Sequence, residues 1–292
     1  MEPILFRSIV IETEPQLTRF HGIIQAARDF TSTKSLEFFA LHVKALTITR
    51  TYSHDEVLLI LKACQNVKAM TYWGNLRDAK DDAIRSFLTS GLSPRRTYVT
   101  SSLFTQDSMD FSYPIFQNTT HIELVWEDVD VDDSSRPGYE VKWDTLQDLK
   151  HLTHLSIFVP SARMKNCAQR VTKIITHCPQ GLRVFVFWAC HMHYFRKGHA
   201  EFEGIRAINE GEVDVRAVVA YMGSSFSMRS DYQEARPIIR SYSDIVDDCA
   251  GTTLGKDFWA LAEERIEERL RQRSIQVRRF TVPERSFFHL AP

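Results

Sequence analysis

The sequence predicts an α/β protein built from stacked parallel strands and helices, and three observations lead to that fold class. Short β-branched and aromatic runs recur along the chain, and they start at residues 5, 43, 67, 96, 121, 152, 182 and 215. The intervals between these starts are 24 to 33 residues after a first interval of 38. The runs share a spacing of apolar residues, and helical patterns lie between them. Such a period is typical of an array in which each unit buries its apolar face against the next.

Each run predicts a strand, because its β-branched and aromatic residues alternate between two faces. The runs are LFRSIVI (5–11), VKALTIT (43–49), VKAMTYW (67–73), RTYVTSSLF (96–104), HIELVWE (121–127), LTHLSIFV (152–159), LRVFVFWA (182–189) and VRAVVAYM (215–222).

Five of these runs fit one template of apolar residues, with the spacing Leu-x-x-Leu-x-Leu. The template residues are Val43, Leu46 and Ile48; Val67, Met70 and Tyr72; Leu152, Leu155 and Ile157; Leu182, Phe185 and Phe187; and Val215, Val218 and Ala220. This is the spacing of the strand half of a leucine-rich repeat. We therefore predict an irregular leucine-rich-repeat-like solenoid of stacked parallel strands and helices over residues 1–222.

The segments between strands predict amphipathic helices. EVLLILKACQNVKAMTYW (56–73) matches RVTKIITHCPQGLRVFVFW (170–188) with one inserted residue. In both, the helix leads through a cysteine, Cys64 or Cys178, into the next strand. We interpret that cysteine as a small buried residue of the turn and not as a redox group.

After Met222 the strand pattern stops, and residues 223–273 predict a connecting segment followed by a helix. GKDFWALAEERIEERLRQRS (255–274) places Phe258, Ala262, Ile266 and Leu270 four residues apart, as on a surface helix with one apolar stripe. We expect this helix to cap the open end of the array, since a terminal repeat must cover its core. Residues 274–292 are rich in arginine, and we expect a poorly ordered basic tail.

Four segments carry a resemblance to a known family. EPILFRSIVI (2–11), PIFQNTTHI (114–122), LKHLTHL (149–155) and GKDFWALAEERIEER (255–269) resemble fungal F-box/leucine-rich-repeat-like proteins, and the likeness covers nearly the whole chain. The resemblance implies an interaction protein whose repeat surface receives a protein partner. In that family an F-box docks the Skp-type adaptor of a cullin ubiquitin ligase. Because Met1 stands where the F-box would already have ended, we expect adaptor binding only if an F-box precedes Met1.

Charge and composition argue against several other partners. The 36 basic and 37 acidic residues give a net charge of −1, which disfavours nucleic-acid binding. The N-terminus does not have the basic start of a signal peptide, and no apolar run approaches the ~18 residues of a membrane span. The five cysteines contain no Cys-x-x-Cys pair. We expect a cytoplasmic or nuclear protein without a membrane partner.

Familiar catalytic motifs are missing from the sequence. It contains no Gly-x-Ser-x-Gly, Gly-x-Gly-x-x-Gly or His-Glu-x-x-His pattern. DVDVDD (128–133) begins like a calcium loop, but Asp133 stands where that loop needs glycine. GTTLGK (251–256) is one residue too short for a phosphate loop. We therefore predict neither catalytic residues nor a cofactor.

The loop CHMHYFRKGH (190–199) supports an alternative function, a metal-dependent enzyme. Its histidines His191, His193 and His199 offer three nitrogens that suit zinc. Our preferred interpretation is a loop at the end of a repeat that presents an exposed, pH-sensitive patch of imidazoles.

The leading hypothesis is a non-catalytic scaffold that binds a protein partner along its strand face. Outward positions on that face are Thr47, Thr71, Glu123, Ser156 and Val186. Large aromatic side chains often anchor protein partners. The candidate anchors are Tyr72, Trp73, Trp126, Phe158 and Trp188.

Overall fold

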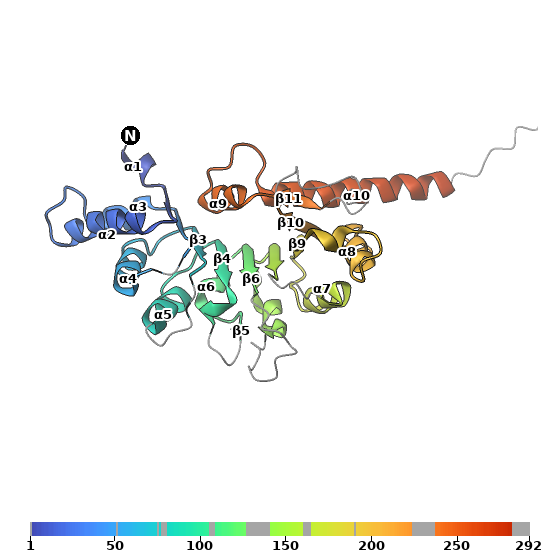
Figure 1. The fold of residues 1–292 in the computed structure, drawn as a ribbon, viewed down its shortest axis with the longest axis horizontal. Helices are drawn as coiled ribbons and strands as arrows, with labels where there is room; N and C mark the ends of the chain where they lie inside the picture. The colour runs from blue at the N-terminus through green and yellow to red at the C-terminus, as the bar shows by residue number, and fades with distance from the viewer. Residues whose placement is uncertain are drawn as a thin grey trace, which may run out of the picture.

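The computed structural model describes residues 2–50, 52–74, 76, 81–104, 109–126, 141–159, 165–189, 191–223 and 237–281. The acidic stretch 128–133 and Cys190 lie outside these residues. Within them, the chain forms a nine-stranded sheet in which every pair of neighbours is parallel and the strand order follows the chain (Figure 1). The predicted α/β class is confirmed.

All eight predicted runs contain a strand of this sheet. The nine strands are β1 (Ser8–Ile11), β2 (Ala45–Ile48), β3 (Ala69–Tyr72), β4 (Arg96–Thr100), β6 (His121–Val125), β8 (His154–Phe158), β9 (Val184–Ala189), β10 (Ala217–Met222) and β11 (Ile238–Arg240). The prediction that no strand follows Met222 is wrong, because the structure adds one more strand, β11. With three residues, β11 is too short to show an alternating pattern in the sequence. The short strands β5 (Met109–Asp110) and β7 (Val141–Lys142) pair separately.

Helices lie on both sides of the sheet. They are α1 (Glu2–Leu5), α2 (Glu14–Arg28), α3 (Leu36–His42), α4 (His54–Ala63), α5 (Asp82–Ser90), α6 (Pro114–Gln117), α7 (Cys167–Thr176), α8 (Phe202–Asn209), α9 (Tyr242–Ala250) and α10 (Phe258–Thr281), with 3-10 turns η2 (Ser101–Leu103), η3 (Trp143–Asp148) and η4 (Met192–Phe195). Helices α4 to α8 follow one side of the sheet, and α9 and α10 follow the other (Figure 1). Both α2 and α3 lie between β1 and β2, which explains the long first interval.

The main core fills the space between the sheet and helices α2 to α8. Inward residues of neighbouring strands stack in register, as Leu46 does on Met70 and Leu155 on Phe185, and all four are buried. The turn cysteines pack beside this core as predicted: Cys64 is buried and Cys178 is half-buried. Burial raises the pKa of both thiols to about 12, so they stay protonated at neutral pH.

Strand β10 departs from the template by one residue. Val215 is 43% exposed, whereas the inward residues that oppose Phe185 and Phe187 are Ala217 and Val219. The template residue Val218 lies on the other face of the sheet, in a second apolar cluster. A shift of one residue exchanges the two faces of a strand, so the fifth template match is wrong in register.

The C-terminal segment continues the fold beyond β10. The expected connecting segment contains β11 and α9, and α10 extends to Thr281, so residues 274–281 belong to a helix and not to the expected tail. Residues 282–292 lie outside the described residues. We expected α10 to lie over the open end of the array, but its contacts run across one face of β9, β10 and β11. In the described part of the chain, no helix has the length and apolar character needed to span a membrane.

The sheet–helix core gives a stability prediction. Leu155→Ala removes a side chain that is fully buried at the centre of the sheet, so the free energy of unfolding should fall by about 3 kcal/mol. The matched control is Leu41→Ala on α3, whose side chain is 62% exposed and should matter far less. Urea denaturation followed by circular dichroism measures both, and equal losses would contradict the assigned core.

Candidate interaction surfaces

The face of the sheet opposite α4 to α8, here called the outer face, is covered by the C-terminal segment. Strand register places one row of outward residues across it: Thr47, Thr71, Tyr98, Glu123, Ser156, Val186 and Val218. All seven are buried. Ile245 and Cys249 of α9 and Phe258, Trp259 and Ala262 of α10 form an apolar cluster with several of them. The outward positions that we assigned to a partner are therefore occupied by this chain's own helices.

A buried charge cluster joins the C-terminal segment to the middle of the sheet. Arg240 of β11 is 3% exposed, and its Nη2 lies 2.5 Å from Oδ2 of Asp248 on α9. Its Nη1 lies 3.6 Å from Oε2 of Glu123 on β6, which is 4% exposed. The guanidinium also stacks over the ring of Phe258, 4.1 Å from its centroid. Burial raises the pKa of Glu123 against the opposing charge of Arg240, and the Asp248 carboxylate adds to the rise.

Two stacked histidines lie under the start of α10. The rings of His121 on β6 and His154 on β8 are 4.1 Å apart and nearly parallel, and each meets the Trp259 ring at a steep angle. Burial, together with the nearby charges of His154, Arg96 and Arg183, lowers the pKa of His121 to about 2. Burial also lowers the pKa of His154, although Glu263 lies 3.2 Å from its Nε2 and opposes the shift.

Two of the five aromatic candidates belong to the protein interior. Tyr72 is 2% exposed and packs in the main core, as the last residue of its template should. Trp188 is 1% exposed, and its indole N–H donates a hydrogen bond of 2.7 Å to the Ser156 hydroxyl. Neither side chain offers surface to a partner, so Tyr72 and Trp188 are removed from the partner-binding candidates.

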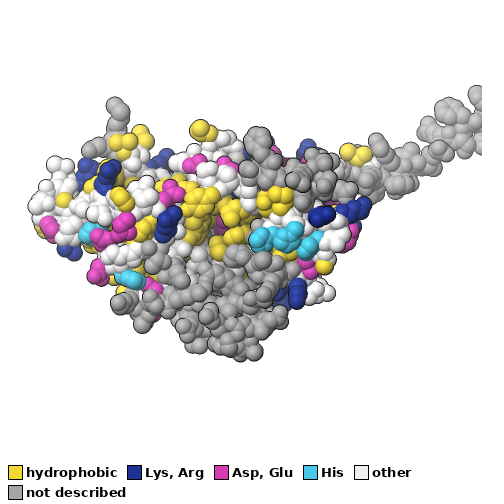
Figure 2. All heavy atoms as spheres, viewed as in Figure 1, with side chains coloured by type: hydrophobic (Ala, Val, Ile, Leu, Met, Phe, Trp, Pro, Cys, Tyr) yellow, Lys and Arg dark blue, Asp and Glu magenta, His cyan; other side chains and the backbone are white. Residues whose placement is uncertain are grey.

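The other three aromatic candidates are half-buried at the carboxyl ends of the strands. The Trp73 ring lies 6.1 Å from Tyr242, and the Phe158 ring meets Trp188 edge-on. Trp126 packs against Trp143, with their ring centroids 5.3 Å apart. In the view of Figure 2, hydrophobic side chains form a band across the middle of the molecule, with a group of histidines at its edge.

The histidine-rich loop is folded into the turn η4 and does not continue strand β9. His191 and His193 stack with their ring centroids 5.2 Å apart, and His199 lies 5.0 Å from His193. Nδ1 of His199 accepts a hydrogen bond from the Glu201 amide. Burial, helped by the two neighbouring imidazoles, lowers the pKa of His193. Among the described residues, no three His, Cys, Asp or Glu side chains are grouped so that they could hold a metal ion.

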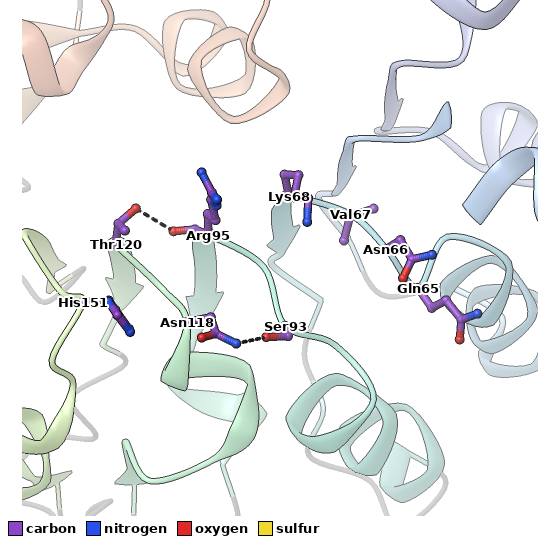
Figure 3. Close-up of a pocket in the computed structure, with 9 residues that line it drawn as sticks. All are labelled: Gln65, Asn66, Val67, Lys68, Ser93, Arg95, Asn118, Thr120 and His151. Carbon is purple, nitrogen blue, oxygen red and sulfur yellow. Dashed lines mark hydrogen bonds between the residues drawn. The ribbon is translucent and has the colours of Figure 1, made fainter. Parts of the chain in front are cut away.

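A groove of about 550 Å³ opens at the amino ends of the central strands (Figure 3). It is lined by the turns that lead into β3, β4, β6 and β8: Gln65, Asn66, Val67, Lys68, Ser93, Arg95, Asn118, Thr120 and His151. Asn118 donates a hydrogen bond of 2.8 Å to Ser93, and Thr120 donates one of 3.0 Å to the Arg95 carbonyl. The lining combines cations with amides and hydroxyls, and none of these residues is acidic.

Backbone hydrogen bonds align these turns into one row, here called the amino edge. The amide of Lys44 donates to the carbonyl of Arg7, that of Lys68 to Lys44, and that of Arg95 to Lys68. The same ladder continues through Thr120, Thr153 and Arg183. Sequence reasoning missed this site, although a basic residue recurs at the start of the runs VKALTIT, VKAMTYW and LRVFVFWA.

No match to a known protein accompanies these surfaces. No protein-family model matches the chain, and neither a curated protein nor a solved structure does. The resemblance drawn from the sequence therefore enters the functional argument only as a proposal.

The buried charge cluster should make the fold sensitive to Arg240. Arg240→Met leaves the carboxyl groups of Glu123 and Asp248 buried without a cation. The free energy of unfolding should therefore fall by about 3 to 5 kcal/mol. Arg206→Met is the control, because Arg206 pairs with Glu203 and Glu210 on an exposed helix surface and should have little effect. Chemical denaturation measures the difference. If the two variants are equally stable, the cluster does not hold the C-terminal segment.

The stacked histidines should make stability fall in mild acid. In the unfolded chain a histidine binds a proton near pH 6.5, whereas native His121 stays neutral down to about pH 2. Below about pH 6.5 the unfolded state therefore binds more protons than the native state. The free energy of unfolding then falls as the pH falls, by about 1 kcal/mol per pH unit. Above that pH the effect vanishes.

His121→Gln should flatten this dependence between pH 5 and 7, whereas His151→Gln, at an exposed position, should leave it unchanged. The measurement is the urea midpoint as a function of pH. An unchanged slope in His121→Gln would show that His121 titrates normally in the native protein.

Proposed function

We propose that the chain is a leucine-rich-repeat-like solenoid that serves as a non-catalytic scaffold for a protein partner. The observation that carries this proposal is the strand order: nine parallel strands lie side by side in the order of the chain. Such an array grows by adding one unit to the next, and each unit presents equivalent positions along a continuous surface. In this view α9 and α10 form a C-terminal cover on the outer face.

The burial pattern supports the same proposal. Template residues of four units, from Val43 to Phe187, are buried, and each strand packs on its neighbour in register. Extended arrays of this kind offer a partner surface spread over several repeats. The family resemblance implies the same role, that of the substrate-recognition part of an F-box/leucine-rich-repeat protein.

The partner's contact surface is expected at the margin of the sheet. Helices fill one face and the C-terminal segment fills the other, so exposed side chains of successive repeats align along the edges. The amino edge carries the groove, and its lining of amides, hydroxyls and cations suits polar recognition.

Cross-linking in cells tests the scaffold role. The tagged chain is expressed in its source cells, treated with a lysine-reactive cross-linker, and purified for mass spectrometry. We expect one protein at near-stoichiometric amounts, with cross-links at the exposed amino-edge lysines Lys68 and Lys150 and not at Lys173 on α7. Recovery of the chain without a stoichiometric partner would argue against a scaffold.

A further inference from the structure

The amino edge carries a row of cations with few carboxylates to balance it. Arg7, Lys68 and Arg95 are exposed, Lys44 is half-buried, and among the described residues none of the four has an ion-pair partner. Two neighbouring cations are different: Arg96 at the start of β4 lies 3.3 Å from Asp257, and Arg183 before β9 lies 3.0 Å from Glu263. Within the described residues, the four unpaired cations of the row therefore precede or begin the turns into β1, β2, β3 and β4, one for each strand.

The spacing of these cations follows from the sheet. Neighbouring strands are about 4.8 Å apart, so the four residues from Arg7 to Arg95 span about 14 Å. An extended peptide advances about 3.3 Å per residue, and four or five residues cover that distance. Successive side chains of such a peptide alternate between two faces, so about two or three acidic side chains face the row, within reach of the long Lys and Arg side chains.

The groove next to the row provides groups for a peptide main chain. The side-chain amides of Gln65 and Asn66 each offer both donors and an acceptor, as a main chain requires. The hydroxyls of Ser93 and Thr120 and the amide of Asn118 lie across the groove from them (Figure 3). The volume of about 550 Å³ is larger than a single inorganic anion needs.

The lining favours a peptide over a nucleic acid. Proteins that hold single strands stack bases on aromatic side chains, and His151 supplies the only ring among the described lining residues. The net charge of −1 also differs from the basic balance typical of nucleic-acid binding domains.

We propose that the groove and cation row at the amino edge bind an extended acidic segment of the protein partner, with Lys68 and Arg95 contacting its carboxylates. This inference rests on the proposed scaffold function and names the chemistry that the scaffold recognises. The acidic segment lies across the strand ends, from β1 toward β6, and the groove residues bind its main chain.

Fluorescence anisotropy tests the proposal directly on the full chain. The probe is a labelled ten-residue peptide of alternating Glu and Ser, and its neutral counterpart replaces every Glu with Gln. We expect the acidic probe to bind, to weaken as salt rises, and to bind at least about tenfold more tightly than the neutral probe.

A double variant locates the site. Lys68→Gln with Arg95→Gln removes two exposed charges that contact the peptide's carboxylates and should weaken binding of the acidic probe about tenfold. The matched control is Lys173→Gln, an exposed lysine on α7, which should bind as the unmodified chain does. Thermal melts of all three proteins confirm that they are folded.

Several results would overturn the inference. Equal binding of the acidic and neutral probes, equal binding by the double variant and the unmodified chain, or tighter binding of a labelled ten-nucleotide uridine RNA would each do so. The scaffold proposal is judged separately by cross-linking. A stoichiometric partner captured equally by the double variant would keep the scaffold and reject the acidic groove.

Discussion

Arg240 is the residue on which the arrangement of the outer face depends. Its guanidinium lies between Glu123 of the central strand β6 and Asp248 of α9, and it stacks on Phe258 at the start of α10. A buried charge is tolerated only where its partners are close, so the pairing favours one position for the C-terminal segment on the sheet. The apolar cluster around Trp188 and Trp259 supplies the buried hydrophobic surface between the sheet and the C-terminal segment, and the charges specify where this contact forms.

Because the outer face is closed, the partner contact that we propose lies at the edges of the sheet and not on its face. A parallel sheet covered by helices on both sides leaves its turns as the exposed, repeated feature. At the carboxyl ends, Trp73, Trp126 and Phe158 remain half-buried. At the amino ends, Lys68 and Arg95 line an open groove. These two edges differ in chemistry, one aromatic and the other basic, and the basic edge also carries the amides and hydroxyls of the groove.

The sequence predicts the fold well where one face of a strand is apolar and the other is not. Leu155 and Ile157 alternate with more polar residues, and their strand and face were predicted correctly. Strand β10 is buried on both faces, so its apolar residues do not alternate and its register could not be deduced. Trp188 was assigned to a binding surface because the spacing of residues within a strand does not show that a helix distant in sequence covers the outer face. The groove was missed because its cations stand one per repeat, far apart in sequence.

Acidic residues at and just before the start of α10 balance some of the cations near the amino edge. Asp257 and Glu263 lie beside Arg96 and Arg183, and the stacked pair His121 and His154 is held neutral under Trp259. The C-terminal segment therefore balances Arg96 and Arg183, while Arg7, Lys44, Lys68 and Arg95 have no ion-pair partner among the described residues. An acidic segment that enters this edge therefore meets the cations that the C-terminal segment leaves without an ion-pair partner.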